Sequence, residues 1–132
     1  MPLTGHASHD IRTFRDLAAW QRGIELVLAT YRVTEGFPRE ERFGLVSQMR
    51  RAATSVPANI AEGFGRGRNL EFIRYLEIAR GSLFELQTHA EVAQQLKWLP
   101  ADSWREFVAL SEEVDRIVSG LLRGLRRRSR QG

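Results

Sequence analysis

The chain has 132 residues, no cysteine and a formal net charge of +4. A single domain of this length buries roughly two-thirds of its unfolded surface, so it needs neither a disulfide nor a metal to fold. The lack of cysteine excludes thiol catalysis, thiol redox chemistry and cysteine-ligated zinc. No apolar run approaches roughly 18 residues, and the start of the chain is polar, so we expect a soluble, cytoplasmic protein with no membrane role.

The charge is unevenly distributed along the chain. Residues 123–132 carry +5 with no acidic residue, whereas residues 1–122 hold 15 basic and 16 acidic side chains, which gives −1. The arginines of this basic tail are Arg123, Arg126, Arg127, Arg128 and Arg130. Terminal basic blocks attract nucleic acid or anionic surfaces, although many are simply solvated chain ends.

Apolar spacing predicts a first helix from about residue 13 to 35. Its apolar positions recur three and four apart, at Leu17, Trp20, Ile24, Val27 and Tyr31. Thr13 and Asp16 resemble a capping box, and the Gly-Phe-Pro at 36–38 ends the helix. A second helix is predicted from Pro38 to the glycines at 63, 65 and 67. Its apolar row is Leu45, Met49, Ala53, Val56 and Ile60.

A third helix is predicted from about residue 69 to 98, and it carries two rows of heptad spacing. The first row is apolar: Phe72, Leu76, Ala79, Leu83, Leu86, Ala90 and Ala93. The second row is mixed: Tyr75, Ile78, Ser82, Glu85, His89, Val92 and Leu96. A helix that buries both rows must be covered over more than one face, which indicates a contact between subunits.

The fourth helix is predicted to begin at Ser103, with Glu106 completing a capping box. Its apolar stripe is Phe107, Leu110, Val114, Ile117 and Leu121, widened by Val118, Leu122 and Leu125. Gly120 and Gly124 each lower helix stability by up to about 1 kcal/mol relative to alanine. We therefore expect the end of this helix to fray into the basic tail.

Short connections between the helices predict an all-α, antiparallel up-down-up-down four-helix bundle over residues 13–122. It follows a flexible N-terminal segment, residues 1–12, and precedes the basic tail, residues 123–132. This topology brings the start of the first helix, the turn between the second and third helices, and the tail to one pole. Arg12, Arg15, Arg66, Arg68 and the tail arginines should gather there.

The second helix also carries a polar row and an internal proline. Pro57 lacks the amide that would bond the Ala53 carbonyl, so a kink or a restart is expected there. The polar row is Gln48, Arg51, Ser55, Asn59 and Glu62, spaced three or four apart on one face. This row is either a polar surface that tolerates a proline or a buried network with Ser82, Glu85 and His89. Thr54, Ser55 and Asn59 have the side chains to hydrogen-bond at the proline break.

Three chemistries are weaker candidates. The glycines and arginines at 63–68 could cradle a phosphate, but they follow a helix and lack a lysine and a hydroxyl, which favours a simple turn. Glu85 and His89 stand four apart with no second copy, which favours an ion pair or hydrogen bond over a metal site. His6 and His9 lie in the flexible start. We expect no metal, no cofactor and no enzymatic activity.

Three segments resemble one bacterial family: FRDLAAWQRGIELV, FPREERFGLVSQMRRAATSVPANIAEGFGR and FIRYLEIARGSLFELQTHAEVAQQL. The family is the four-helix-bundle proteins first noted as open reading frames within 23S ribosomal RNA intervening sequences, and the resemblance covers roughly residues 12–122. Its central block is Gln48, Arg51, Ser55, Pro57, Asn59, Ile60, Ala61, Glu62 and Gly63, followed by Gly81, Ser82 and Glu85.

The resemblance implies a left-handed antiparallel bundle and, as in known relatives, a cyclic homopentamer. It implies no settled activity. A more distant relative, the accessory variability protein of diversity-generating retroelements, is also a pentamer and works with a reverse transcriptase and nucleic acid. Nucleic-acid binding is therefore the family-level expectation.

Cyclic symmetry would place every tail on one rim, so five copies of +5 would give about +25. We expect such a rim to bind RNA or DNA phosphates through Arg66, Arg68 and the tail arginines, with affinity that falls steeply with salt. The alternative is a protein-interaction scaffold with no nucleic-acid role, in which the polar strip serves assembly alone. That strip is Arg51, Asn59, Glu62 and Glu85.

Overall fold

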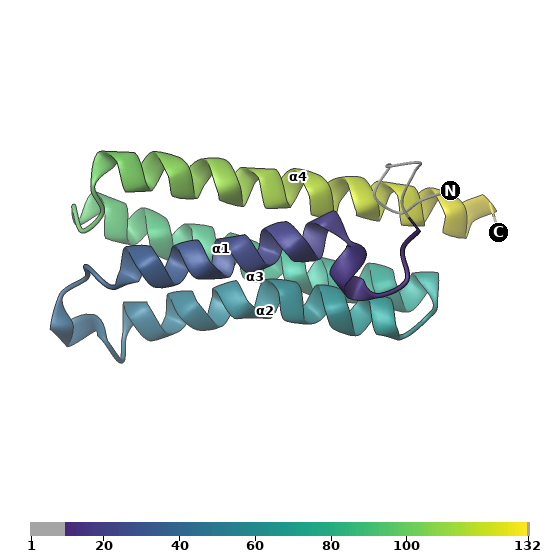
Figure 1. Cartoon of the computed structure of the whole chain (residues 1–132), viewed down its shortest axis with the longest axis horizontal. Coiled ribbons are helices and arrows are strands. Elements are labelled where there is room, and N and C mark those ends of the chain that lie inside the picture. The colour runs from purple at the N-terminus through teal and green to yellow at the C-terminus, as the bar shows by residue number, and fades with distance from the viewer. Residues whose placement is uncertain (1–9, 132) are drawn as a thin grey trace.

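The structure, a computed structural model, describes residues 10–131 and contains four α-helices and no strand over that range (Figure 1). The helices are α1 (Ala18–Thr34), α2 (Leu45–Gly65), α3 (Asn69–Gln95) and α4 (Ala101–Gln131). Successive helices run in opposite directions, and each packs against two neighbours: α1 and α3 both contact α2 and α4. The predicted four-helix bundle is confirmed. Most of the N-terminal segment predicted to be flexible, with His6 and His9, lies outside the described residues.

The predicted capping box at Thr13 is confirmed, but it opens a single 3-10 turn, η1 (Phe14–Asp16), and not the long helix. The Thr13 hydroxyl accepts a hydrogen bond from the Arg15 amide at 3.1 Å, and the Asp16 carboxylate accepts one from the Thr13 amide at 3.0 Å. Extended backbone at Leu17 then separates this turn from α1.

The second helix begins later than Pro38. A 3-10 turn, η2 (Arg39–Glu41), follows Pro38, and the non-helical backbone of Gly44 separates this turn from α2. The Glu41 carboxylate accepts a hydrogen bond from the Leu45 amide at 3.2 Å, and so satisfies one of the free donors at the start of α2. The turn between η2 and α2 leaves Phe43 89% exposed.

Both ends of α4 differ from the prediction. The helix begins at Ala101, directly after Pro100, so Ser103 lies inside the first turn and is not its cap. The end of the helix does not fray into the basic tail as expected, because α4 continues to Gln131. Leu121, Leu122 and Leu125 are buried on this last part of the helix. Their burial stabilises the helix by more than the two glycines weaken it.

The core follows the predicted seams on α2 and α3. All seven residues of the first α3 row are buried, as are Met49, Ala53, Val56 and Ile60 of α2. The second α3 row is only partly covered within one chain: Tyr75, Ser82 and His89 are half-buried. Its apolar members Ile78, Val92 and Leu96 remain 42%, 46% and 53% exposed.

Of the row predicted for the first helix, Leu17 is buried as expected, but the buried face of α1 itself was predicted wrongly. It consists of Ala19, Gly23, Leu26, Thr30 and Thr34. The large residues of the predicted row flank this face: Trp20, Ile24 and Val27 are half-buried and Tyr31 is exposed. The hydroxyls of Thr30 and Thr34 each donate to the carbonyl four residues earlier at 2.7 Å, so their burial leaves no donor unsatisfied.

Small residues bring α1 close to α2 beside the proline. A Cβ atom on Gly23 would lie 3.4 Å from Cβ of Pro57, in ordinary van der Waals contact, so Gly23 faces the buried proline ring directly. The helix α2 is continuous through Pro57 and does not restart there. The kink stays a prediction.

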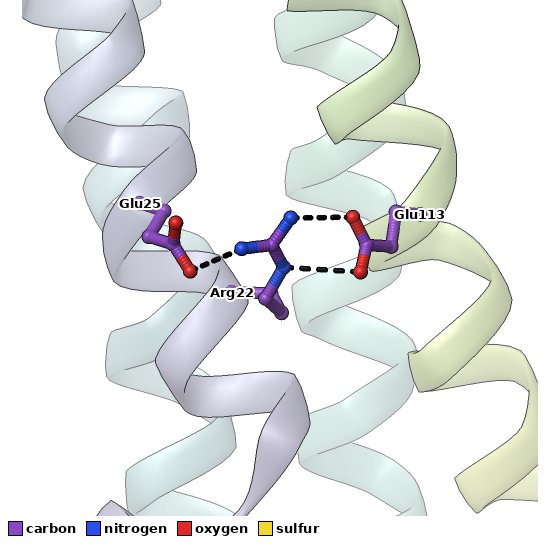
Figure 2. Close-up of polar contacts among 3 residues, drawn as sticks. All are labelled: Arg22, Glu25 and Glu113. Carbon is purple, nitrogen blue, oxygen red and sulfur yellow. Dashed lines mark hydrogen bonds and ion pairs between the residues drawn. The ribbon is translucent and has the colours of Figure 1, made fainter.

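An ion pair joins α1 to α4 on the outside of the bundle (Figure 2). The guanidinium of Arg22 donates to both carboxylate oxygens of Glu113, at 3.0 and 2.6 Å, and its third nitrogen pairs with Glu25. This hydrogen bonding lowers the pKa of Glu113 and raises that of Arg22. Both side chains of the interhelical pair remain about a third exposed. Within residues 10–131, no helix has both the length and the apolar character required to cross a bilayer.

We expect Gly63→Ala to destabilise the bundle. The added Cβ would lie 2.6 Å from Cβ of Tyr75 and 3.1 Å from Cδ1 of Phe72, so α2 and α3 would have to separate. Overpacking of this kind costs about 1–3 kcal/mol of unfolding free energy, measurable by urea denaturation. Gly65→Ala is the control, because nothing lies within 4 Å of its added Cβ. Equal stability of the two variants would contradict the close packing at Gly63.

We expect Glu113→Gln to reduce the acid sensitivity of folding. The pKa of Glu113 lies below its ordinary value of 4.5 in the folded chain, so its stabilisation is complete above that pH and is lost as pH falls through the folded pKa. At neutral pH the variant should lose up to about 1 kcal/mol, because solvent screens this partly exposed pair. Thermal unfolding between pH 3 and 7 measures the difference. Glu112→Gln, which alters an exposed neighbouring carboxylate, should keep the wild-type profile.

Candidate nucleic-acid interface

One pole of the bundle collects three segments that lie far apart in the sequence. Figure 1 shows η1, the turn between α2 and α3, and the end of α4 at the same end of the molecule. Gly67 in the α2–α3 turn has a φ of +77°, a conformation that glycine adopts without strain. This turn places Arg66 and Arg68 at the pole where the tail arginines lie, as the sequence predicted.

The tail arginines belong to a helix, which gives them a fixed arrangement. Arg123, Arg127 and Arg130 are spaced four and three apart, so they share one face of α4, and all three are exposed. Leu122 and Leu125 are buried on another face of the same segment. The last acidic residue of the chain is Asp115. The final part of α4 is therefore a continuous cationic helix.

Two of the predicted phosphate contacts are already paired with carboxylates. Arg126 forms an ion pair with Glu77 of α3. Arg66 pairs with Glu62 at 2.7 Å and donates to the Tyr75 hydroxyl at 2.9 Å. The hydrogen bond to Glu62 raises the pKa of Arg66, whose charge is thereby locally balanced. The other five arginines of the predicted set make no ion pair within residues 10–131: Arg68, Arg123, Arg127, Arg128 and Arg130.

The polar rows of α2 and α3 meet at one point. The hydroxyls of Ser55 and Ser82 lie 2.8 Å apart across the helix interface. The Asn59 amide donates to the Ser55 hydroxyl at 2.9 Å and to the Ser55 carbonyl at 2.8 Å. All three residues are half-buried. Thr54 donates to the carbonyls of Arg50 and Arg51, and not to the Ala53 carbonyl that Pro57 leaves without its amide partner.

The remaining members of the predicted network lie apart from this cluster. Glu85 and His89 face each other along α3 at 3.5 Å, and Glu62 turns toward Arg66. The side chains of Gln48 and Arg51 are exposed and make no hydrogen bond within residues 10–131. Over the same range, no three metal-ligating side chains come together. The rows therefore form separate small clusters and not one buried network.

Sequence reasoning missed the contacts that α4 makes across the bundle. Besides the Arg22–Glu113 pair, Arg80 of α3 donates to Asp115 of α4 at 2.9 Å. The sequence did carry a signal for both pairs. An arginine stands beside the core face of α1 and of α3, and a carboxylate stands beside the core face of α4. Sequence reasoning also missed a basic, aromatic groove at the other pole, around Arg42, Phe43 and Arg51. The only sequence signal for this groove was Phe43, a large apolar residue between Arg42 and Gly44 in a predicted helix.

Comparison with curated proteins found no match. Among solved structures, the chain is similar to a crystal structure of a protein of unknown function from the S23 ribosomal protein family of Bacteroides thetaiotaomicron. The two share 18% identity with a TM-score of 0.71, over 80% of this chain and 98% of the other, which shows a common fold. The family described as 23S rRNA-intervening sequence protein matches residues 15–120. This match spans most of the bundle, and the chain therefore belongs to that family.

Proposed function

We propose that this chain is a non-enzymatic nucleic-acid-binding protein that contacts phosphates through the exposed arginines at the pole of α4. The observation that supports this function best is the unbroken helix to Gln131, which holds Arg123, Arg127 and Arg130 on one exposed face. Arg68 adds a further unpaired charge from the α2–α3 turn at the same pole. A surface of this kind attracts the phosphate backbone of RNA or DNA.

A helical array of arginines suits backbone binding better than sequence recognition. Guanidinium groups pair with phosphates in a forked geometry, and phosphate contacts carry no sequence information. The helix rises 1.5 Å per residue, so Arg123 and Arg130 are separated by about 10 Å along its axis. We therefore propose binding that depends strongly on salt and weakly on base sequence.

We further propose that copies of the chain assemble through the second row of α3, as the family resemblance to pentamers implies. The uncovered side chains of Ile78, Val92 and Leu96 support this proposal, because they lie on one helix face at heptad spacing. Burying them against another copy would remove apolar surface from water. A ring would bring the arginine helices of all copies to one rim.

The same exposed row also favours the second candidate function, an interaction scaffold with no nucleic-acid role. In that case assembly would persist while nucleic acid would not be retained at any salt concentration. The two functions are separated by measuring binding and particle size on the same samples.

We expect the triple variant Arg123→Gln, Arg127→Gln, Arg130→Gln to lose most of its affinity for nucleic acid. Each phosphate contact contributes about 0.9 to the slope of log affinity against log salt on duplex DNA. Loss of three contacts should therefore reduce that slope by about 2.7. Fluorescence anisotropy with labelled duplex DNA and RNA, between low and moderate salt, measures both quantities.

Arg105→Gln is the matched control for this experiment, because Arg105 pairs with Asp102 at the start of α4, at the opposite pole. It should bind as the wild type does. If the wild type binds neither the duplex DNA nor the RNA at low salt, the nucleic-acid function is wrong. The interaction scaffold is then the function that is left.

We expect Val92→Glu to break the assembly. Sedimentation of the wild type should give a particle near five copies of the 15.1-kDa chain, about 75 kDa. The variant should sediment as a single chain, because a charge on the α3 face would be buried without a partner. Glu91→Gln alters an exposed neighbour and should leave the particle size unchanged. A wild type that sediments as one chain at micromolar concentration contradicts the proposal.

A further inference from the structure

A basic groove lies at the pole opposite the α4 arginines. It runs between the end of α1 and the start of α2 and has a volume of about 390 Å³, within the range of small-ligand sites. Its lining combines three arginines with two aromatic rings and contains no carboxylate. The lining residues are Tyr31, Arg42, Phe43, Val46, Ser47, Arg50, Arg51 and Thr54.

The three arginines of this groove differ in how they are held. Arg50 is fixed: its Nε donates to the Thr34 hydroxyl at 3.0 Å, and its guanidinium lies 4.4 Å from the centroid of the Tyr31 ring. The guanidinium groups of Arg42 and Arg51 make no hydrogen bond or ion pair within residues 10–131, and both side chains are exposed. The groove therefore has one arginine that shapes its wall and two that remain available to an anion.

Nearby carboxylates do not neutralise these two arginines. The carboxylate of Glu41 accepts the hydrogen bond from the Leu45 amide at the start of α2. Glu35 lines an adjoining hollow together with Arg39, Arg42 and Arg50, where basic residues again outnumber the acid. This end of the bundle therefore favours a negatively charged ligand.

Phe43 gives the groove its second chemical property. It is 89% exposed, more than any other large apolar side chain of the described residues, so it has no role in the core. The guanidinium of Arg42 lies 5.7 Å from the centroid of its ring. An open aromatic face beside unpaired arginines is the combination on which bases of single-stranded nucleic acid stack.

We propose that this groove binds a nucleotide, with its phosphate on Arg42 and Arg51 and its base stacked on the ring of Phe43. The exposed aromatic face favours a planar ligand over an acidic peptide, which would use the arginines alone. The nucleotide can be free or an unpaired residue of a strand, because both present the same phosphate and base. The inference goes beyond the function proposed for α4, since it concerns another pole and a preference for unpaired bases.

The test compares Phe43→Ala and Phe43→Trp with the wild-type full chain. Fluorescence anisotropy is measured with a labelled oligothymidylate of about 12 nucleotides and with a duplex of the same length. We expect Phe43→Ala to weaken binding of the single strand about fivefold or more and to leave duplex binding unchanged. Phe43→Trp keeps a stacking surface and should bind the single strand at least as well as the wild type.

A second pair of variants tests the phosphate contacts. The double variant Arg42→Gln, Arg51→Gln should weaken single-strand binding, whereas Arg105→Gln, at the same pole but paired with Asp102, should not. Circular dichroism checks that each variant remains helical. Phe43→Ala is also introduced into the triple arginine variant of α4, which should have lost duplex binding. In that background Phe43→Ala should still weaken single-strand binding by the same factor. This result would show that the two sites are separate.

Calorimetry with adenosine monophosphate distinguishes the two sources of the ligand. Saturable binding that requires Arg42 and Arg51 identifies a free-nucleotide site, and binding of the strand alone identifies its unpaired nucleotides; either result supports the proposal. The proposal is overturned if Phe43→Ala binds the single strand as the wild type does, or if neither probe binds. It is also overturned if hexaglutamate binds the groove arginines and displaces the strand as effectively as an equally charged oligothymidylate.

Discussion

The close contact between α2 and α3 determines how the rest of the molecule is arranged. Gly63 leaves no room for a side chain against Tyr75, and the hydroxyls of Ser55 and Ser82 meet across the same interface. A hydrogen bond between two half-buried hydroxyls is directional, so it favours one register of the two helices where apolar packing alone would tolerate several. That register turns the first row of α3 into the core and leaves Ile78, Val92 and Leu96 of its second row exposed.

The sequence predicted all four helices, and it predicted the buried face well on α2 and α3 but not on α1. The first α3 row was found in full because seven apolar residues in sustained heptad spacing have few other interpretations. The core face of α1 was missed because it is built from Gly23 and from threonines that bond their own backbone. At the end of α4, the local preference of two glycines was outweighed by buried leucines, which only the tertiary structure reveals. The polar rows were identified correctly, and the spacing of four already favoured a pair between Glu85 and His89. Spacing could not show that Ser55, Asn59 and Ser82 are the members of these rows that meet.

The two poles of the bundle offer different chemistry from the same residue type. At the end of α4, arginines stand on a helix with no aromatic partner in their row, an arrangement suited to a continuous phosphate backbone. Around Phe43, arginines flank an open ring, an arrangement suited to a single base and its phosphate. The shared fold of the family does not determine either property, because function depends on the surface groups that a fold carries.

Because the arginines of α4 are displayed by a helix anchored through Leu122 and Leu125, their direction depends on the length of the segment as much as on its composition. Each residue of an α-helix turns the chain by about 100°. A single inserted or deleted residue between Asp115 and Arg123 would rotate the exposed arginine face about the helix axis, although every arginine would still be present. Selection on this part of the molecule should therefore tolerate exchanges of side chains far more readily than changes of length.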